Sequence, residues 1–244
     1  MKNRSENFNY RPFVVPAVVA LIMTITIIYF VNNPGGAMGA RILTYKGILK
    51  MLRQHINLVV IASSLAIMTA VPLGILITRQ KFRVLTPIVD SIVNITQTVP
   101  SLAVLALSYV FLGIGFKTAV FALWLYALLP ILRNTSIGIQ SINEDIIDAA
   151  KGMGMTPLRI LTRIELPLAL SIMFAGIRTS IVISVGVATL STFIGAGGLG
   201  DLIVTGLSLM RTHIILAGAI LSALLAILLD NVLGSVEARL KSEA

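Results

Sequence analysis

The chain has 244 residues, of which 57% are hydrophobic and only 12% are charged, and its mean hydropathy is +0.96. Soluble domains carry about 25% charged residues, so this composition excludes an ordinary water-soluble domain and predicts an all-α, polytopic membrane protein. The net charge of +9 comes from lysines and arginines that lie almost wholly between apolar runs, which disfavours nucleic-acid binding, and the lack of cysteine excludes disulfides and thiolate sites.

Six segments are long and apolar enough to cross a bilayer, whose hydrocarbon core of roughly 30 Å takes about 20 helical residues. The first follows basic residues as a secretory signal would, but it is longer than the apolar part of a signal, and Asn32 to Gly35 is a poor cleavage site, so we expect a retained span. Six crossings place both termini on one side. The predicted spans are residues 13–31, 56–78, 88–112, 118–137, 168–190 and 213–233.

The basic residues of the connections predict the orientation, because cytoplasmic connections carry the excess. Twelve lie on the side of the two termini and of the 138–167 connection, six lie on the other side, and Arg178 lies within a span. This distribution places both termini in the cytoplasm. An alternative topology makes residues 13–31 peripheral.

Residues 41–53 oppose this orientation, because they place four basic residues on the predicted outer side. Isoleucines and leucines are interleaved with these charges, so we expect a basic amphipathic helix lying on the outer interface. His55 and His213 are far apart in sequence, and we expect interfacial residues rather than a metal pair.

The third predicted span is interrupted by the polar stretch Gln97, Thr98, Pro100 and Ser101. Pro100 removes a backbone donor and frees a carbonyl, which membranes tolerate where side chains or water complete the bonding. We favour a kink that lines the translocation pathway over a purely structural kink.

Arg178 is the one ionisable residue clearly deep within a predicted span. A charge at the bilayer centre costs at least about 2.5 kcal/mol on insertion scales, so this side chain needs water, a carbonyl or a partner. Two interpretations stay open, one in which Arg178 lines the pathway and one in which it is a structural pair at a helix interface. No carboxylate lies near the midplane to bind a coupling ion, which disfavours a proton- or sodium-driven carrier.

The 138–167 connection predicts two short helices held against the inner membrane surface. Ser141 and Glu144 have the spacing of a capping box, which marks a helix start. Gly152 and Gly154 end this helix, and its apolar stripe is formed by Ile142, Ile146, Ala149, Ala150 and Met153.

Thr156 and Pro157 predict the start of the second short helix, as N-cap and first helical residue, and Pro167 marks the start of the next span. Together the two helices present apolar and charged faces at once. This favours a docking element for a cytoplasmic protein over an interfacial hairpin without a partner.

The spacing within this connection resembles the EAA signature of the permease subunits of bacterial ABC importers. Every spacing agrees, and the one departure is Asp148 in place of the first Glu. The resemblance implies a MetI-like fold with a five-helix core, extending over roughly residues 56–235, and a coupling helix that fits a cleft of an ATP-binding subunit, with Gly154 as its bend. The implied ATPase-coupling residues are Asp148, Ala149, Ala150, Gly152, Gly154, Ile164, Leu166 and Pro167.

This resemblance divides the chain into an N-terminal tail with an extra transmembrane helix, residues 1–40, and a permease domain, residues 41–244, whose coupling segment is about 141–167. The implied protein lies in the bacterial inner membrane and is not itself an enzyme. No cofactor is expected in this chain, since ATP and Mg belong to the partner subunit. The expected partners are that ATP-binding subunit, an identical or homologous second permease, an extracytoplasmic substrate-binding protein and the lipid bilayer, but no nucleic acid.

Several further phrases are similar to the osmoprotectant branch of this family, among them HINLVVIASSLAIMTAVPLGI, QTVPSLAVLAL and FIGAGGLGDLIVTGLS. They imply transport of glycine betaine, carnitine or choline. The alternatives are a permease for another small solute such as methionine, and an ion-coupled secondary carrier. A membrane-embedded enzyme would need a cluster of polar catalytic groups, which the sequence lacks.

Residues 195–200 fit the G-x-G-x-x-G pattern of dinucleotide sites, but they follow an apolar helix rather than a strand. We expect close backbone packing or a turn near the outer mouth of the pathway. No phosphate-binding G-x-x-x-x-G-K-[ST] loop occurs, so ATP hydrolysis must take place in another chain.

Overall fold

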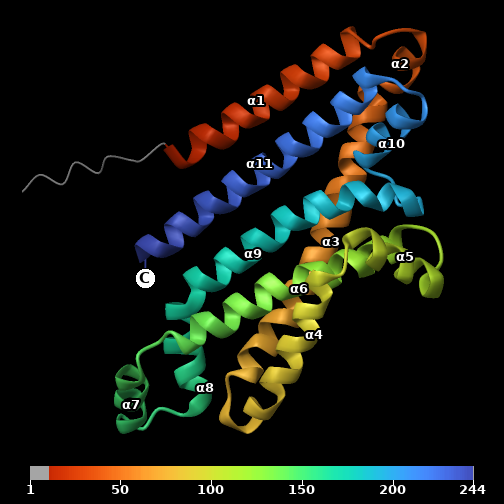
Figure 1. Cartoon of the computed structure of the whole chain (residues 1–244). Coiled ribbons are helices and arrows are strands. Elements are labelled where there is room, and N and C mark those ends of the chain that lie inside the picture. Colours follow the sequence, from red (N-terminus) through yellow and green to blue (C-terminus); the bar gives the residue numbers. More distant parts are fainter. Residues whose placement is uncertain (1–10, 244) are drawn as a thin grey trace, which may run out of the picture.

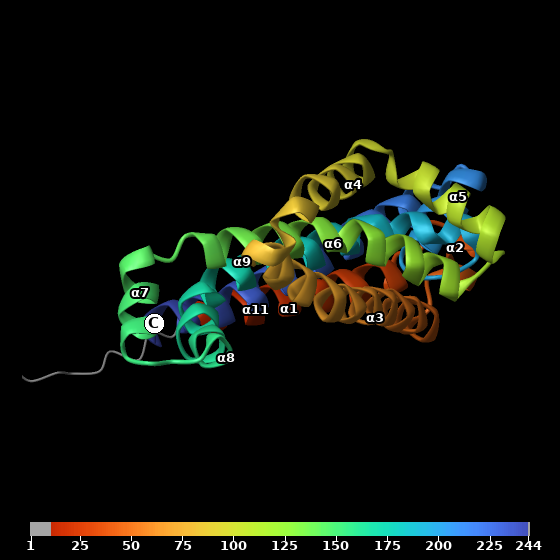
Figure 2. The same cartoon turned by 90° about the horizontal axis from the view of Figure 1, so that it is seen from below.

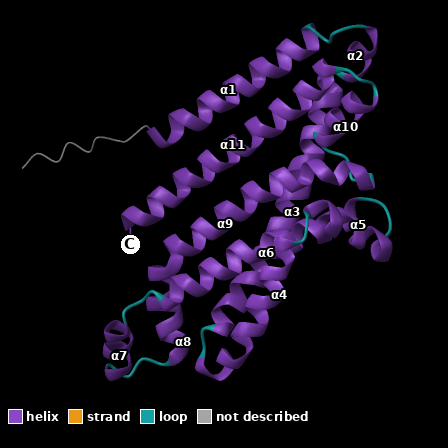
Figure 3. Ribbon diagram, viewed as in Figure 1, coloured by secondary structure: helices purple, strands orange, loops and turns teal. Residues whose placement is uncertain are grey.

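The computed structural model describes residues 11–243, in which the ordered elements are all helices (Figure 3). Within this range, side chains are described except those of residues 11–13, 83, 85, 90, 92, 93, 96, 97 and 240–243. Five helical stretches of the described chain are long and apolar enough to cross a membrane, which confirms the predicted all-α polytopic class. They are Val14–Asn32, Tyr45–Ile77, Phe116–Gln140, Pro157–Ile194 and Thr212–Arg239.

The long elements are α1 (Arg11–Asn32), α3 (Tyr45–Ile77), α6 (Phe116–Gln140), α9 (Leu166–Ala188) and α11 (Thr212–Glu243). Shorter helices join them. These are α2 (Ala37–Ile42), η1 (Gln80–Leu85), α4 (Thr86–Thr98), α5 (Ser101–Leu112), α7 (Glu144–Gly152), α8 (Pro157–Ile160), η2 (Leu161–Glu165), η3 (Thr189–Ile194) and α10 (Gly200–Ser208).

The prediction that residues 88–112 form one kinked span is wrong, because these residues form two helices. Helix α4 ends at Thr98 and α5 begins at Ser101, with Pro100 between them in an extended conformation at φ −55° and ψ 136°. Proline cannot donate to a helical ladder and also disfavours helical geometry in the residue before it. The sequence signal at Pro100 was therefore a break between two helices rather than a kink within one.

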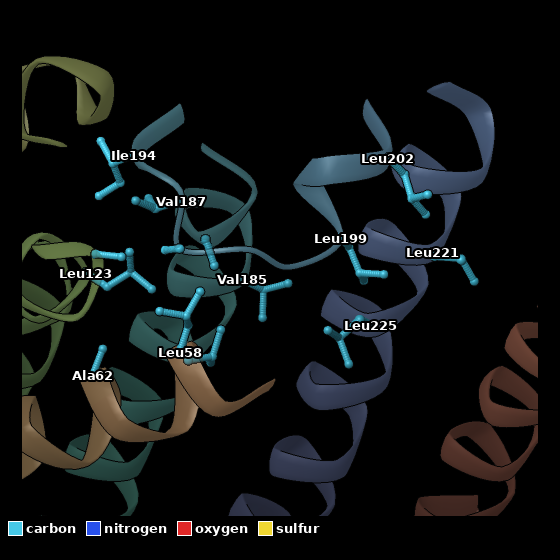
Figure 4. Packing of buried hydrophobic residues seen from close by; sticks show 14 of the residues in the cluster. Leu58, Ala62, Leu123, Val185, Val187, Ile194, Leu199, Leu202, Leu221 and Leu225 are labelled. Atoms are coloured by element: carbon cyan, nitrogen blue, oxygen red, sulfur yellow. The ribbon is translucent and has the colours of Figure 1, made fainter. Parts of the chain in front are cut away.

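Helices α3, α6 and α9 pack side by side at the centre of the bundle, and α11 packs against α9 and α10 (Figures 1 and 2). Helix α1 lies along α11 on the flank. The main core gathers at the end of the bundle near α10, where Leu58 of α3, Leu123 of α6, Val185 of α9 and Leu221 of α11 are buried together (Figure 4). Lipid is as apolar as these side chains, so close packing rather than escape from water holds the helices together.

Residues 41–53 do not form the separate interfacial helix that the sequence predicted. Helix α2 ends at Ile42, and α3 starts at Tyr45 after Thr44, whose hydroxyl accepts a 3.1 Å hydrogen bond from the Gly47 N–H. The basic residues of this segment are exposed, while Leu43 and Ile48 are buried in the main core. Most of the interleaved apolar residues thus pack against neighbouring helices, although Leu49 is exposed, and the segment continues directly into the span.

Candidate functional site

Helix α7 begins at Glu144, and its N-cap lies two residues after the predicted one, Ser141. Asn143 is the N-cap, and its side-chain oxygen accepts a 3.0 Å hydrogen bond from the Asp145 N–H. Ser141 instead closes α6, and its hydroxyl donates to the Gly138 carbonyl at 2.9 Å. The capping-box assignment was therefore wrong, because Ser141 is still needed at the end of the preceding helix. The acidic Glu144 and Asp145 lie in the first turn, where the helix dipole favours them.

Gly154 is the bend after α7, as its position in the sequence predicted. Its φ of +73° lies in the left-handed region, and the Met155 N–H turns back to donate to the Ala150 carbonyl at 3.1 Å. This bond satisfies a carbonyl at the helix end, which is the usual use of a left-handed glycine there. Gly152 is different, since it is the last residue of α7 and keeps a helical conformation.

The second helix starts where predicted, with Thr156 as N-cap and Pro157 in the first turn, although the Thr156 side chain makes no capping bond. It does not stop at Pro167. Helix α8 continues through the π-helical turn η2 into α9, so Pro157–Ile194 is one stretch. A π turn next to a proline relieves the missing donor without ending the helix. The predicted boundary at Pro167 was therefore wrong, and the connection is part of the span that follows it.

Helices α7 and α8 carry a docking surface, which we define as the apolar side chains of Ile146, Ala149, Met153 and Leu158. All four are exposed, with 73% of Met153 and 69% of Leu158 accessible. The Pro157–Ile194 stretch has 38 residues, about 57 Å of helix, which exceeds a hydrocarbon core of roughly 30 Å, so part of it must extend beyond the lipid. Exposed apolar side chains grouped at one end of the bundle form a candidate surface for a partner.

The charged side of α7 faces a cleft of about 930 Å³ between α7, the end of α3 and the start of α4. Asp148 and Lys151 line it, and the Lys151 ammonium donates to the Asp148 carboxylate at 2.8 Å. This hydrogen bond to Asp148 raises the pKa of Lys151 above its usual range. Asp148, the first residue of the motif, is thus held within α7 and turned toward the cleft.

Across this cleft, Glu165 of η2 binds Arg79, the second residue after α3. One guanidinium nitrogen donates to Glu165 Oε1 at 2.9 Å, and the other nitrogen makes a second contact with Oε2. The Glu165 side chain is only 9% exposed and that of Arg79 is 34% exposed. This pair was not predicted from the sequence. A carboxylate within the apolar run Ile164 to Leu166 was a signal for Glu165, but nothing pointed to its partner.

The other motif residues support this surface from within. Ala150 is buried, which lets α7 approach its neighbours, and Ile164 and Leu166 are partly buried on either side of Glu165. Pro167 is exposed in the first turn of α9. The structure therefore brings the predicted coupling residues together in one segment.

The predicted pathway residues surround the break between α4 and α5, which packs against α6. The Pro100 carbonyl accepts the Ala103 N–H at 2.8 Å, and the Thr98 hydroxyl donates to Ile95. The hydroxyl of Tyr126 on α6 donates to the Val99 carbonyl, so a side chain does complete the bonding at the break. Ser101 begins α5, and the side chain of Gln97 lies outside the described ones.

Arg178 lies elsewhere, at the interface of α9 and α11. Its guanidinium donates to both carboxylate oxygens of Asp230, at 2.6 and 2.8 Å, and to Glu237 at 3.0 Å. The structure does not bring it together with the 97–101 break. These contacts favour the structural interpretation, while a role of Arg178 in the pathway stays a prediction.

His55 is fully buried among the helices, whereas His213 is exposed. The Nδ1 atom of His55 accepts a hydrogen bond from the Leu199 N–H at 3.3 Å. Nε2 of the same ring therefore carries the proton, and it donates to the Val185 carbonyl at 3.1 Å. A Cβ at Gly198 would lie 3.2 Å from Nδ1. The prediction of close backbone packing in residues 195–200 is confirmed, and a side chain with one donor and one acceptor explains why histidine occupies the site.

Residues 70–242 match the model of a protein family described as binding-protein-dependent transport system inner membrane component. The chain belongs to this family. It is a multi-pass inner-membrane protein and the permease subunit of an ABC transporter complex, which the motif at residues 148–167 predicted. As a permease it is not itself an enzyme, and no cofactor is expected in it.

The permease is 47% identical over 187 residues to the choline transport system permease protein OpuBB of Bacillus subtilis, which covers 77% of this chain and 85% of that protein. It is 46% identical over 191 residues to the carnitine transport permease protein OpuCB of Listeria monocytogenes, covering 78% and 87%. Against the glycine betaine/carnitine/choline permease OpuCD of Bacillus subtilis, the identity is 45%, covering 78% and 82%.

The fold of the permease is similar to that of a chain in the inward-facing MetNI methionine ABC transporter. The TM-score is 0.70 at 22% identity, and the match covers 79% of this chain and 95% of that one. A chain in an amino acid ABC transporter gives a TM-score of 0.67 at 16% identity, covering 79% and 93%. These likenesses confirm the MetI-like fold.

Proposed function

We propose that this permease imports osmoprotectants such as glycine betaine, carnitine or choline, driven by ATP hydrolysis in a separate subunit. The observation that carries the proposal is the identity of 45–47% to permeases named for these solutes, over more than three quarters of the chain. The likeness to a methionine transporter is much weaker in sequence, at 22%, and supports only the shared fold. Methionine is therefore the less favoured substrate.

In this proposal the ATP-binding subunit receives the docking surface of α7 and α8. An exposed apolar helix face fits a groove on a partner, and this one lies at an end of the bundle, outside the predicted hydrocarbon layer. Asp148, Ala149, Ala150, Gly152, Gly154, Ile164, Leu166 and Pro167 shape and support the segment. The movement it transmits would open and close the pathway.

A second permease and a substrate-binding protein complete the proposed assembly. Helix α5 exposes Leu107, Val110 and Phe111, beside the break at Pro100. This apolar face supports packing of an identical or homologous permease there, with the pathway between the two chains lined by residues 97–101. The substrate-binding protein would deliver solute at the end of the bundle opposite α7.

The proposed orientation places both termini and α7 in the cytoplasm. The described start of α1 and the end of α11 lie at the same end of the bundle as α7 and α8, while α2 and α10 lie at the other end (Figures 1 and 2). This arrangement supports the orientation that the basic residues predict. We keep the division into residues 1–40 and a permease domain of residues 41–244, and residues 1–10 lie outside the described part of the chain.

Uptake by the complete transporter in proteoliposomes tests the proposal. With ATP enclosed on the ATPase side, we expect accumulation of labelled glycine betaine, carnitine or choline and none of methionine. Uptake of methionine alone would overturn the substrate assignment. Uptake that follows a proton or sodium gradient without the ATPase subunit would overturn the ABC mechanism itself.

A further inference from the structure

The ion pair between Glu165 and Arg79 lies in the cleft between α7, the end of α3 and the start of α4, beside the apolar cluster that Leu166 shares with α3. Helix α7 lines one wall of that cleft, and the end of α3 and the start of α4 line the other. In the described part of the chain, this is the only side-chain ion pair or hydrogen bond from residues 144–165 to another segment. It is therefore the polar connection between the docking segment and the wall of this cleft formed by α3 and α4.

The geometry of the pair fixes the orientation of the Arg79 guanidinium relative to the Glu165 carboxylate. Two parallel N–H to oxygen contacts hold a guanidinium and a carboxylate in one plane, unlike the single contact of a lysine. The Glu165 side chain is almost fully buried, so water cannot easily replace its partner. A displacement of η2 must either move Arg79 with it or leave a buried carboxylate without its partner.

On the other side, Arg79 is bound firmly to the helices that lead to the pathway. Its carbonyl accepts the Phe82 N–H at 2.9 Å in η1. The Thr86 hydroxyl at the start of α4 donates to the Ile77 carbonyl at the end of α3 at 3.1 Å. Helix α4 in turn ends at Thr98, beside the break at Pro100. Movement that reaches Arg79 is thus passed to α3 and α4.

We infer that the Arg79–Glu165 pair transmits displacement of the docking segment to α3 and α4, which makes Arg79 a positioning residue for coupling. The inference rests on the proposed function, since it requires an ATPase subunit that moves α7. The movement of α7 would then reach the rest of the permease by two routes. One follows the continuous helix from α8 into α9, and the other crosses the cleft through the ion pair toward the 97–101 break.

The test compares Arg79→Gln, Glu165→Gln and the double variant in the complete transporter. Two quantities are measured in proteoliposomes, solute transported per ATP hydrolysed and retention of the ATPase subunit during purification. We expect full retention and a fall of at least about fivefold in transport per ATP, the lower end of ordinary coupling between sites. The double variant should be no worse than either single one, because both remove the same connection. Lys81→Gln, an exposed change two residues away, should leave both quantities unchanged.

Three results would overturn the inference. Wild-type transport per ATP in both single variants would show that the pair transmits nothing. Single effects that multiply in the double variant would show that the two residues act separately. Loss of the ATPase subunit from both variants would show that the pair shapes the docking surface instead. Failure of the wild-type permease to retain an ATPase subunit would instead remove the proposed function, and the inference with it.

Discussion

The guanidinium of Arg178 on α9 forms two hydrogen bonds to the carboxylate of Asp230 on α11, at 2.6 and 2.8 Å. Both side chains are about one third exposed, and Glu237 accepts a third bond from the same guanidinium. The pair joins two neighbouring spans, so it is a structural contact whether or not solute passes near it.

Replacing Asp230 with Asn is expected to lower the free energy of unfolding by about 1.5 kcal/mol, the lower end for hydrogen bonds to charged groups because the pair is partly exposed. Arg178→Met should cost at least as much, since it removes the contacts to both Asp230 and Glu237. Thermal unfolding in detergent measures both. If Arg178→Met unfolds like wild type yet abolishes transport, Arg178 belongs to the pathway instead.

Gly154→Asp should release the ATPase subunit. An L-residue at φ +73° costs about 1 to 2 kcal/mol, and a Cβ there meets nothing within 4 Å, so the change strains the bend without a clash. Gly113→Asp is the matched control, because Gly113 after α5 has a similar φ of +77° and a Cβ there also meets nothing within 4 Å. Pull-down in detergent should recover the ATPase with Gly113→Asp and not with Gly154→Asp. Equal recovery with both variants would contradict the docking assignment.

Met153→Glu should also weaken ATPase binding, by adding a charge to the apolar docking surface. Its side chain is 73% exposed, so the stability of the permease itself should change by less than about 0.5 kcal/mol. Met210→Glu is the comparison, since Met210 is 90% exposed and lies just after α10, at the other end of the bundle. The affinity of each variant for the ATPase subunit is measured by titrating that subunit onto detergent-solubilised permease, and only Met153→Glu should bind it more weakly than wild type. Equal weakening of ATPase binding by both substitutions would mean that the added charge lowers the affinity wherever it lies, and would contradict the docking surface.

His55→Leu is expected to destabilise the permease by about 2 to 6 kcal/mol, because it leaves the buried Leu199 N–H and Val185 carbonyl without partners at about 1 to 3 kcal/mol each. His213→Leu, at an exposed position, should have little effect. Thermal unfolding in detergent provides the measurement. A His55→Leu variant as stable as wild type would show that these two backbone groups find other partners.

Local signals in the sequence were enough to locate the candidate site. The left-handed turn at Gly154 and the start of α8 at Pro157 each depend on the backbone preferences of one or two residues, and the structure has both where they were expected. The long apolar runs likewise predicted the class of fold. In these cases the physical cause lies within a few positions of the residue itself.

The errors and omissions arose where tertiary contacts decide between local options. Ser141 and Asn143 can both cap a helix, and only the length of α6 assigns Ser141 to its end. The burial of His55 depends on a loop 144 positions away, and the Arg79–Glu165 pair spans 86 positions. A local sequence pattern cannot predict contacts between residues so far apart in the chain. Pro167 was a fair boundary signal, but the π turn before it absorbs the missing donor.

The uninterrupted stretch from Pro157 to Ile194 has a mechanical consequence for the two faces of the membrane. At one end it carries Leu158 of the docking surface, and at the other it leads into the Gly195–Gly200 loop that contacts His55. A tilt imposed at the first end must appear as an opposite swing at the second, as in a lever that pivots inside the bilayer. A change at the docking surface on one side of the membrane would then be linked to the Gly195–Gly200 loop on the other side by the stiffness of one helical stretch.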